Sequence, residues 1–259
     1  MHLKNKNIVL TGAASGIGLE LFRILCSHRN KILAVDKDED GLIKLSAEFP
    51  EADYLTADLS REEGLEKLLA YLEYRRLPID LFFANAGYAR YGHWADLGEE
   101  ERQRLWFIHV ENPIRTARWL MERQGNHPFQ LLITASAMAY WPVPGYGYYA
   151  ACKAAIHRFA ENLWAEKEGD WLSLAYPAAT ASQFFRTAGK NIPLPFPLQS
   201  PVQVAKQLLK GAEKKQKRIF PSKVFWWAYQ LNRFFPFIQS IYTSMERQKL
   251  DRWKSMEKR

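Results

Sequence analysis

Tyr149 and Lys153 are the residues of this 259-residue chain best suited to proton chemistry. They begin an alanine-rich run that is expected to be helical from Tyr149 to Glu168. Residues four apart on a helix share one face, so the phenol and the ammonium point into the same space. A free tyrosine has a pKa of about 10, and a nearby lysine favours the phenolate. The pair therefore predicts general acid–base chemistry at Tyr149, the alternative being an ordinary solvated helix face.

Ser136 follows the apolar run at residues 129–134, which is typical of a buried strand. A hydroxyl at the end of such a strand can donate a hydrogen bond to a substrate oxygen. Ser136, Tyr149 and Lys153 are thus candidate catalytic residues, and no metal-ligand motif accompanies them.

Three glycines, Gly12, Gly16 and Gly18, separate a β-rich run at Asn7–Thr11 from an apolar-periodic helix at Leu19–Ser27. In this context the first glycine allows a tight turn, the second lets the backbone approach a pyrophosphate, and the third lets helix pack on strand. The helix N-terminus then faces the phosphates. The spacing G-x-x-x-G-x-G differs from the commoner G-x-G-x-x-G, and an ordinary strand-to-helix turn is the alternative.

An acidic residue, Asp36, ends the second predicted strand at Lys31–Asp36. At this position an aspartate hydrogen-bonds the adenosine ribose and repels a 2′-phosphate. NAD is therefore favoured over NADP, which is not excluded because Lys37 follows directly.

Further strands are expected at residues 52–57, 78–84, 171–176 and 218–221, and helices at 61–74 and 99–124. This alternation predicts an α/β, doubly wound parallel sheet with helices on both faces, in one domain over residues 1–221. Ligands of such sheets bind beyond the carboxyl ends of the strands. The residues expected at that edge are Gly12, Asp36, Asp58, Asn85 and Ser136.

Taken together, Thr11–Gly18, Asn85-Ala86-Gly87, Ser136 and Tyr149-x-x-x-Lys153 make the chain resemble the short-chain dehydrogenase/reductase family over residues 5–221. The resemblance implies a Rossmann-like fold of about seven parallel strands. It also implies hydride transfer between a nicotinamide and a secondary alcohol or ketone, and a homodimer or homotetramer that pairs through the two long helices.

The resemblance also assigns roles to individual residues. Tyr149 would be the acid/base, Lys153 would hold the nicotinamide ribose, and Ser136 would polarise the substrate oxygen. The segment 177–182 corresponds to the family's Pro-Gly-x-Val-x-Thr, with Ser182 replacing the threonine hydroxyl, whereas Ala178 and Thr180 depart from the pattern. The cofactor contacts carried over are Gly12, Ser15, Gly16, Ile17, Gly18, Asp36, Asp58, Asn85, Ala86, Gly87, Tyr149, Lys153, Pro177, Thr180 and Ser182.

One departure concerns the asparagine that completes the family's catalytic tetrad, where this sequence has His109. His109 is expected to hold the same relay water or to titrate within the relay. A histidine packed in the interior is the alternative, as is a one-turn shift that makes Asn112 the tetrad residue.

The net charge is +8, and residues 206–259 hold 14 Lys/Arg against 4 Asp/Glu, so the basic character lies in the tail. Two cysteines provide no disulfide framework and fit a reducing compartment, which predicts a cytoplasmic protein. Neither a signal peptide nor an 18-residue apolar span is expected.

The tail at residues 222–259 is expected to be a helical extension in which Trp, Phe and Tyr alternate with Lys and Arg. This pattern is typical of an interfacial helix, so peripheral contact with the inner membrane face is predicted. The alternative is packing on the chain's own domain or on a twin subunit. Nucleic acid is not expected to bind, because no recognition motif accompanies the charge.

Bulky side chains are expected around the pocket, and they predict an apolar, lipid- or steroid-like alcohol or ketone. Packing within a lid is the other explanation for them, and residues 183–197 are expected to form either a lid loop or a plain surface loop. Two alternative hypotheses for the function of the chain are a non-catalytic dinucleotide-binding regulatory module and a structural membrane adaptor. The bulky residues are Tyr88, Tyr91, Trp94, Trp141, Tyr146, Phe184 and Phe185.

Overall fold

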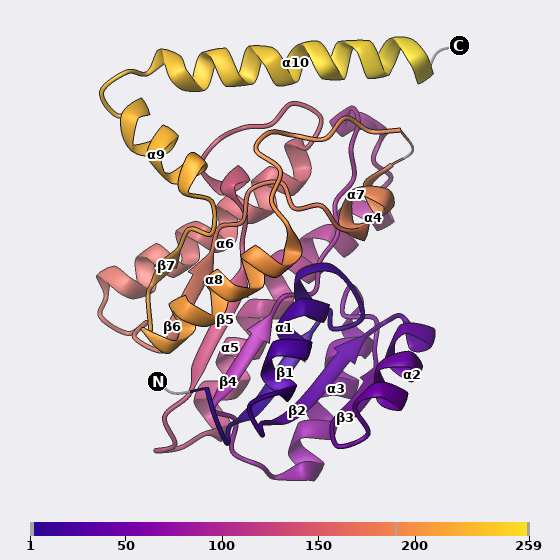
Figure 1. The fold of residues 1–259 in the computed structure, drawn as a ribbon, viewed down its shortest axis with the longest axis vertical. Coiled ribbons are helices and arrows are strands. Elements are labelled where there is room, and N and C mark those ends of the chain that lie inside the picture. Colours follow the sequence, from indigo (N-terminus) through magenta and orange to yellow (C-terminus); the bar gives the residue numbers. More distant parts are fainter. Residues whose placement is uncertain (1–2, 190, 258–259) are drawn as a thin grey trace.

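A seven-stranded, wholly parallel sheet forms the centre of the protein (Figure 1), in the order β3-β2-β1-β4-β5-β6-β7. The computed structural model describes residues 3–189 and 191–257. The strands are β1 Asn7–Thr11, β2 Lys31–Asp36, β3 Asp53–Thr56, β4 Leu81–Ala84, β5 Gln130–Thr134, β6 Leu172–Ala175 and β7 Arg218–Ile219.

Helices cover both faces of the sheet, which confirms the doubly wound α/β architecture expected from the sequence. They are α1 Gly16–Cys26, α2 Glu39–Glu48, α3 Glu62–Arg75, α4 Glu99–Trp106, α5 Asn112–Arg123, α6 Gly147–Ala165, α7 Gln183–Ala188, α8 Pro201–Glu213, α9 Lys223–Asn232 and α10 Phe237–Glu257.

Two hydrophobic cores result from the alternation of side chains along each strand. On β1, Val9 packs into the core under α3, α5 and α6, whereas its neighbours Ile8 and Leu10 pack into the core under α1 and α8. The central strands are apolar at nearly every position because both of their faces are buried. The polar residues that follow these strands are thereby held at one edge.

The helix expected over residues 99–124 is present from Glu99 to Arg123, but it is not α-helical throughout. A π-helical turn at Phe107–Glu111 lies between α4 and α5 and contains His109. Such turns insert one extra residue into a helix and re-aim the side chains beside it, and they are frequent at functional sites.

One expectation needs correction. Residues 183–197 are not all loop, because they begin with the short helix α7. The expected helical tail is present and consists of two helices, α9 and α10, which are separated near Pro236, a residue that lacks a backbone donor. The side chain of Asn232 joins them by accepting from Gln239 N at 2.9 Å.

The helix α10 lies across one end of the molecule, away from the sheet (Figure 1). Phe225 of α9 is buried against Trp141, and Tyr242 of α10 packs on the same cluster. None of the helices in the described ranges has both the length and the hydrophobicity of a membrane span.

Candidate active site

A cleft of about 270 Å³ lies at the carboxyl edge of the sheet. Every candidate catalytic and cofactor-binding residue predicted from the sequence lines it except Gly18. Of the bulky residues expected around the pocket, Tyr88, Phe184 and Phe185 line this cleft, whereas Tyr91, Trp94 and Tyr146 do not. The structure therefore brings the glycine turn, the strand-end residues and the Ser136–Tyr149–Lys153 group into one site.

The glycine turn is shaped for a close approach to its neighbours. Gly12 has φ +70°, and a Cβ added there would lie 2.9 Å from the Ala86 Cα. Gly16 has φ +56°, and a Cβ added at Gly18 would lie 1.8 Å from the Gly12 carbonyl oxygen. Gly18 thus lets α1 pack on the turn, as expected, and does not line the cleft.

The start of α1 fits a pyrophosphate. Ser15 is the N-cap residue of α1, but its hydroxyl makes no capping hydrogen bond. The first backbone N–H groups of the helix are therefore available to a ligand. Unpaired N–H groups at a helix N-terminus bind anions. The residues present at this end of the cleft therefore suit a dinucleotide.

Asp36 is fixed at the end of β2 by two backbone donors. Its Oδ2 accepts from Ala14 N at 2.9 Å and its Oδ1 accepts from Asp38 N at 3.0 Å. The neighbouring Lys37 also lines the cleft, and its Nζ lies 5.6 Å from the centroid of the Tyr88 ring. A carboxylate and an ammonium group therefore lie next to each other at the place predicted for the adenosine ribose.

Asp58 lies at the end of β3, where its carboxylate holds its own turn. Its Oδ1 accepts from Ser60 Oγ at 2.7 Å and from Ser60 N at 3.1 Å. The turn thereby presents Asp58, Leu59 and Ser60 to the cleft.

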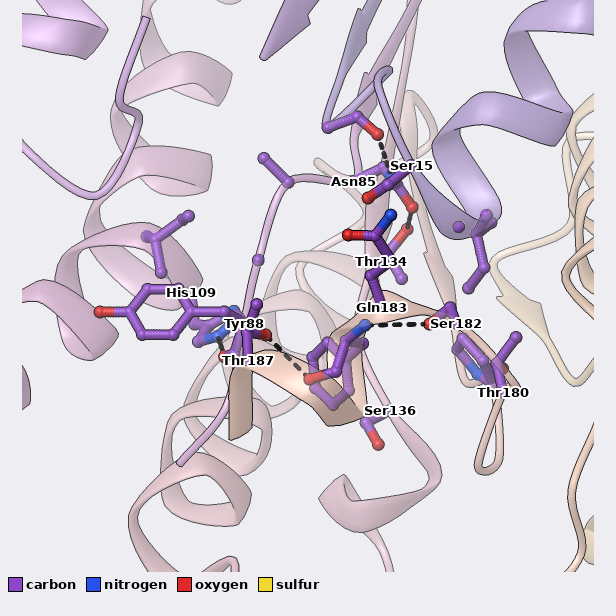
Figure 2. Close-up of a pocket in the computed structure, with 18 of the residues that line it drawn as sticks. Ser15, Asn85, Tyr88, His109, Thr134, Ser136, Thr180, Ser182, Gln183 and Thr187 are labelled. Carbon is purple, nitrogen blue, oxygen red and sulfur yellow. Dashed lines mark hydrogen bonds between the residues drawn. The ribbon is translucent and has the colours of Figure 1, made fainter. Parts of the chain in front are cut away.

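Asn85 connects three strand ends. Its Nδ2 donates to the Thr11 carbonyl at 3.2 Å, and its Oδ1 accepts from Thr134 Oγ1 at 3.1 Å. Figure 2 shows Asn85 and Thr134 lying next to each other in the pocket. The role of Thr134 was not predicted, because nothing in a strand sequence indicates which backbone and hydroxyl groups its neighbours will use.

The ammonium of Lys153 is held by the same residue, since its Nζ donates to the Thr134 carbonyl oxygen at 2.6 Å. It lies 5.5 Å from the centroid of the Tyr149 ring. The predicted i, i+4 pairing of these two residues is therefore present on α6.

The expected lowering of the Tyr149 pKa is wrong for the protein alone. Burial raises the pKa of Tyr149 above its ordinary value, and hydrogen bonding to Ser136 opposes only part of that rise. Burial also lowers the pKa of Lys153 to about 7. Burial thus shifts the pKa of each group in the direction of its neutral form, because the site removes both from water.

Ser136 follows β5 and is the N-cap of a short 3-10 turn, where its Oγ accepts from Met138 N at 3.1 Å. This bond fixes the side chain and leaves the hydroxyl proton free to be donated. Ser136 is buried, with 7% of its surface exposed, next to Tyr149. The geometry thus places two hydroxyls of suitable chemistry in one buried pocket.

His109 lies in the π-helical turn, with its ring centroid 5.1 Å from that of Tyr149. Its Nε2 lies 2.7 Å from the Tyr88 carbonyl oxygen, as Figure 2 shows. Because a carbonyl only accepts, Nε2 carries the proton, and Nδ1 in the neutral ring is an acceptor. That buried Nδ1 has no hydrogen-bond partner within the described residues.

Burial and the nearby Lys153 lower the pKa of His109 well below its ordinary value. The ring therefore stays neutral near pH 7, which removes the predicted titrating role and leaves that of a hydrogen-bond acceptor. The one-turn shift to Asn112 is also not favoured, because Asn112 Nδ2 donates to the Leu59 carbonyl at 3.0 Å and Asn112 does not line the cleft.

The segment 177–182 follows β6 and borders the cleft. Thr180 Oγ1 donates to the Ala178 carbonyl at 3.0 Å, and Ser182 Oγ accepts from Phe184 N at 3.3 Å as the N-cap of α7. The two hydroxyls therefore shape the local backbone, and the Ala178 N–H is taken by Gln199 Oε1 at 3.2 Å.

A second cavity, of about 280 Å³, adjoins the cleft and is lined almost entirely by apolar side chains. Ser136, Met138, Ala178 and Ala179 line both cavities. The second cavity continues between the segment 195–197 and the helices α9 and α10. The catalytic candidates thus lie where a polar cleft meets an apolar chamber.

Comparison with known proteins identifies the class. The family model for short chain dehydrogenases matches residues 6–191. The chain therefore belongs to the short-chain dehydrogenase family, and it is an NAD(P)-dependent oxidoreductase that acts on CH–OH groups.

Individual relatives are distant. A short chain dehydrogenase of Pseudocercospora fijiensis is 28% identical over 233 residues, which are 86% of this chain and 74% of the relative. A short-chain dehydrogenase/reductase of Burkholderia phymatum, solved in complex with NAD, has a TM-score of 0.77 and 20% identity, and the match covers 92% of this chain and 96% of that one.

A short-chain dehydrogenase of Sphingobium yanoikuyae, solved in complex with NADPH, has a TM-score of 0.74 and 23% identity, and the match covers 90% of this chain and 95% of that one. At these identities the solved structures show the fold alone. One carries NAD and the other NADPH.

Proposed function

We propose that this protein is an NAD-preferring dehydrogenase or reductase that interconverts an apolar secondary alcohol and its ketone. The observation that carries the proposal is that Ser136 borders both the polar cleft and the apolar chamber. A nucleotide in the cleft and an apolar molecule in the chamber would therefore meet beside Ser136 and Tyr149.

The proposed roles follow from the geometry. A bound nicotinamide supplies or accepts the hydride. Tyr149, which burial keeps protonated, donates its proton to the carbonyl oxygen during reduction and takes it back during oxidation. Ser136 donates a hydrogen bond to the same oxygen. Lys153, held by the Thr134 carbonyl, orients the nucleotide ribose.

The cofactor contacts predicted from the sequence are proposed for the cleft. The glycine turn and the start of α1 hold the pyrophosphate, Asp36 holds the adenosine ribose, and Asp58 contacts the adenine. The turn at residues 85–87 and the segment 177–182 contact the remaining part of the dinucleotide. The positions of these residues around one cleft support the assignment.

A preference for NAD rests on Asp36, whose carboxylate repels a 2′-phosphate. Lys37 opposes the preference in principle, but its ammonium lies over the Tyr88 ring. We therefore propose that NAD binds more tightly than NADP.

We propose that His109 is a positioning residue that acts through a water. Its Nδ1 is a buried acceptor without a partner in the described structure, beside both Tyr149 and Lys153. A buried acceptor is costly unless it is hydrogen-bonded, and an ordered water is the simplest donor.

The test of the main proposal is NADH formation by the full chain with NAD and a series of secondary alcohols of increasing chain length. Activity should rise with chain length and be absent from Tyr149→Phe. Binding of NADH without turnover of any alcohol or ketone would contradict the proposal and favour the alternative of a dinucleotide-binding regulatory module.

We also propose a cytoplasmic homodimer or homotetramer that pairs through α4–α5 and α6. Trp106 and Met121, exposed by 38% and 54% on α4 and α5, support an apolar contact on that side. Light scattering of the full chain tests the oligomeric state, and a monomer at micromolar concentration would contradict the proposal.

Within each subunit, residues 222–259 are proposed to be an extension of a catalytic domain at residues 1–221. The proposed function of this extension is peripheral contact with a membrane.

A further inference from the structure

The apolar chamber has an opening that can be located from its own lining. Four residues line the chamber and are also more than half exposed, namely Phe196 (62%), Val224 (57%), Ile241 (56%) and Met245 (53%). A side chain that borders a cavity and also faces solvent marks the place where the cavity reaches the surface. The mouth therefore lies between α9, α10 and the segment 195–197, and its rim is apolar.

The apolar surface continues beyond this rim along both helices. On α9, Val224, Trp227 and Leu231 follow each other at helical spacing, with Trp227 and Leu231 exposed by 59% and 46%. Residues at this spacing share one face of a helix. The exposed stripe of α9 therefore extends from the chamber mouth to the turn that follows the helix.

The turn and α10 complete the surface. Phe234 is 80% exposed and Phe235 is 51% exposed, and on α10 Phe237, Ile241 and Met245 repeat at every fourth position. We call the two stripes with the turn and Phe196 the mouth face. It consists of Phe196, Val224, Trp227, Leu231, Phe234, Phe235, Phe237, Ile241 and Met245.

A contiguous apolar surface of this kind on a water-exposed protein marks an interaction site. The helices α9 and α10 lie at one end of the molecule (Figure 1), and the side chains of the mouth face are exposed on them and on the neighbouring segment. The charges of the same two helices favour an anionic partner, because the region 222–257 has six Lys/Arg against three Asp/Glu. Lys223 and Arg233 are exposed at the two ends of α9, beside the apolar stripe.

An internal brace fixes the mouth. Glu246 is buried, with 3% exposed, and lines the chamber. The Nζ of Lys249 donates to Glu246 Oε1 at 2.7 Å and to the Leu194 carbonyl at 3.0 Å. These two bonds connect α10 to the segment that contains Phe196, and they fix the two sides of the opening relative to each other.

We propose that the mouth face docks on the surface of an anionic lipid bilayer, and that the apolar alcohol or ketone enters the chamber directly from that bilayer. The docking extends the membrane contact proposed above for the tail, and the substrate route rests on the proposed catalytic function. A second copy of the chain is the less favoured occupant, because it would cover the mouth through which substrate must pass. Aromatic side chains with neighbouring Lys and Arg are typical of a protein surface lying in the lipid interface.

Docking is tested with the full chain and vesicles of equimolar phosphatidylcholine and phosphatidylglycerol. The wild type should co-sediment with these vesicles and much less with pure phosphatidylcholine. The double variant Trp227→Ser, Phe234→Ser changes exposed residues that do not line either cavity, and should lower vesicle binding by about tenfold or more. Tyr74→Ser on α3, where the side chain is 83% exposed, is the matched control and should bind as the wild type does.

The route is tested by comparing two alcohols with NAD. The double variant should turn over a short, water-soluble secondary alcohol as the wild type does, and should lose about tenfold of the rate with a long-chain alcohol supplied in vesicles. Met245→Trp narrows the mouth, and should keep vesicle binding while lowering the rate with the long-chain alcohol.

Several results overturn the proposal. Absence of wild-type binding to the anionic vesicles, or equal binding by the double variant, excludes docking. Self-association that the double variant abolishes, without vesicle binding, assigns the face to a second copy. Equal rates of the double variant and wild type with the vesicle-borne alcohol exclude the route. Failure of the proposed function is distinguishable, because both alcohols would then be inert while vesicle binding is still measured directly.

Discussion

The ring of His109 lies 5.1 Å from the ring of Tyr149 and nearly perpendicular to it, at 84°. The π-helical turn that carries His109 brings it there, and Gly87 allows the contact, since a Cβ at Gly87 would lie 2.6 Å from His109 Cε1. Only glycine at position 87 therefore leaves room for the imidazole of His109 beside Tyr149.

If Nδ1 of His109 holds a water, removing that acceptor should slow turnover. His109→Leu is expected to lower kcat by about tenfold or more, with a smaller change in KM, and His109→Asn, which keeps an acceptor, should retain more of the rate. Steady-state kinetics with a short secondary alcohol measures both. Equal losses in the two variants, in proportion to their losses of thermal stability, would reduce His109 to a packing residue.

Lys153 should make stability depend on pH. Its pKa is about 7 in the folded protein against an ordinary value of 10.5, so between these values the unfolded chain binds more protons. The free energy of unfolding should therefore rise with pH through this window and be lowest below pH 7. Denaturant unfolding should show that Lys153→Met is more stable than the wild type at pH 6, with a difference that shrinks toward pH 10.

The size of this difference is at most a few kcal/mol, since one pKa unit corresponds to about 1.4 kcal/mol. Lys206→Met, at an exposed position of α8, is the control and should follow the wild-type profile. A difference between Lys153→Met and the wild type that is constant over pH 6 to 10 would show that the ammonium is not penalised by burial.

Asp36 should set the choice of nucleotide. Asp36→Ala removes a negative charge next to the predicted ribose position, and should shift the ratio of NADH to NADPH affinity by about tenfold toward NADPH. Asp40→Ala, an exposed residue of α2 that does not line the cleft, makes the same charge change as a control. Fluorescence titration with the two nucleotides measures the ratios.

Asp36 also accepts bonds from Ala14 N and Asp38 N, so Asp36→Asn, which keeps an acceptor oxygen, separates loss of charge from loss of structure. An unaltered affinity ratio in both Asp36 variants would refute the assignment of NAD.

Gly16 should be intolerant of any side chain. Its φ of +56° strains other residues, and an added Cβ would lie 3.1 Å from the Ser182 Cβ. Gly16→Ala is expected to weaken NADH binding by about tenfold or more, because the turn must shift at the predicted pyrophosphate site. Gly98→Ala, where an added Cβ meets no atom within 4 Å, is the control. Isothermal titration should show normal affinity in the control, and normal affinity in Gly16→Ala would place the pyrophosphate elsewhere.

The sheet, the helices on both its faces and the edge where the site lies can all be predicted from local sequence patterns. Apolar runs such as the one ending at Thr134 are long enough to be read locally, and glycines at 12, 16 and 18 have few other uses between a strand and a helix. The i, i+4 spacing of Tyr149 and Lys153 likewise fixes their common face on any helix.

The protonation of the site, in contrast, follows from tertiary packing. The pKa of Tyr149, Lys153 and His109 depends on how completely other segments exclude water from them, which sequence spacing does not encode. The neutral state of His109 and the Thr134 carbonyl bond of Lys153 belong to this class, because both depend on residues distant in the chain.

The apolar chamber could not be predicted from the sequence either. Its walls come from Ser136 after β5, Phe196 before α8 and the two helices of the tail, which are separated by tens of residues. The tail sequence showed an aromatic, basic composition, but whether those side chains are buried or exposed is settled by packing. Phe225 is buried against Trp141, and Phe234 is left exposed, although the two are only nine residues apart.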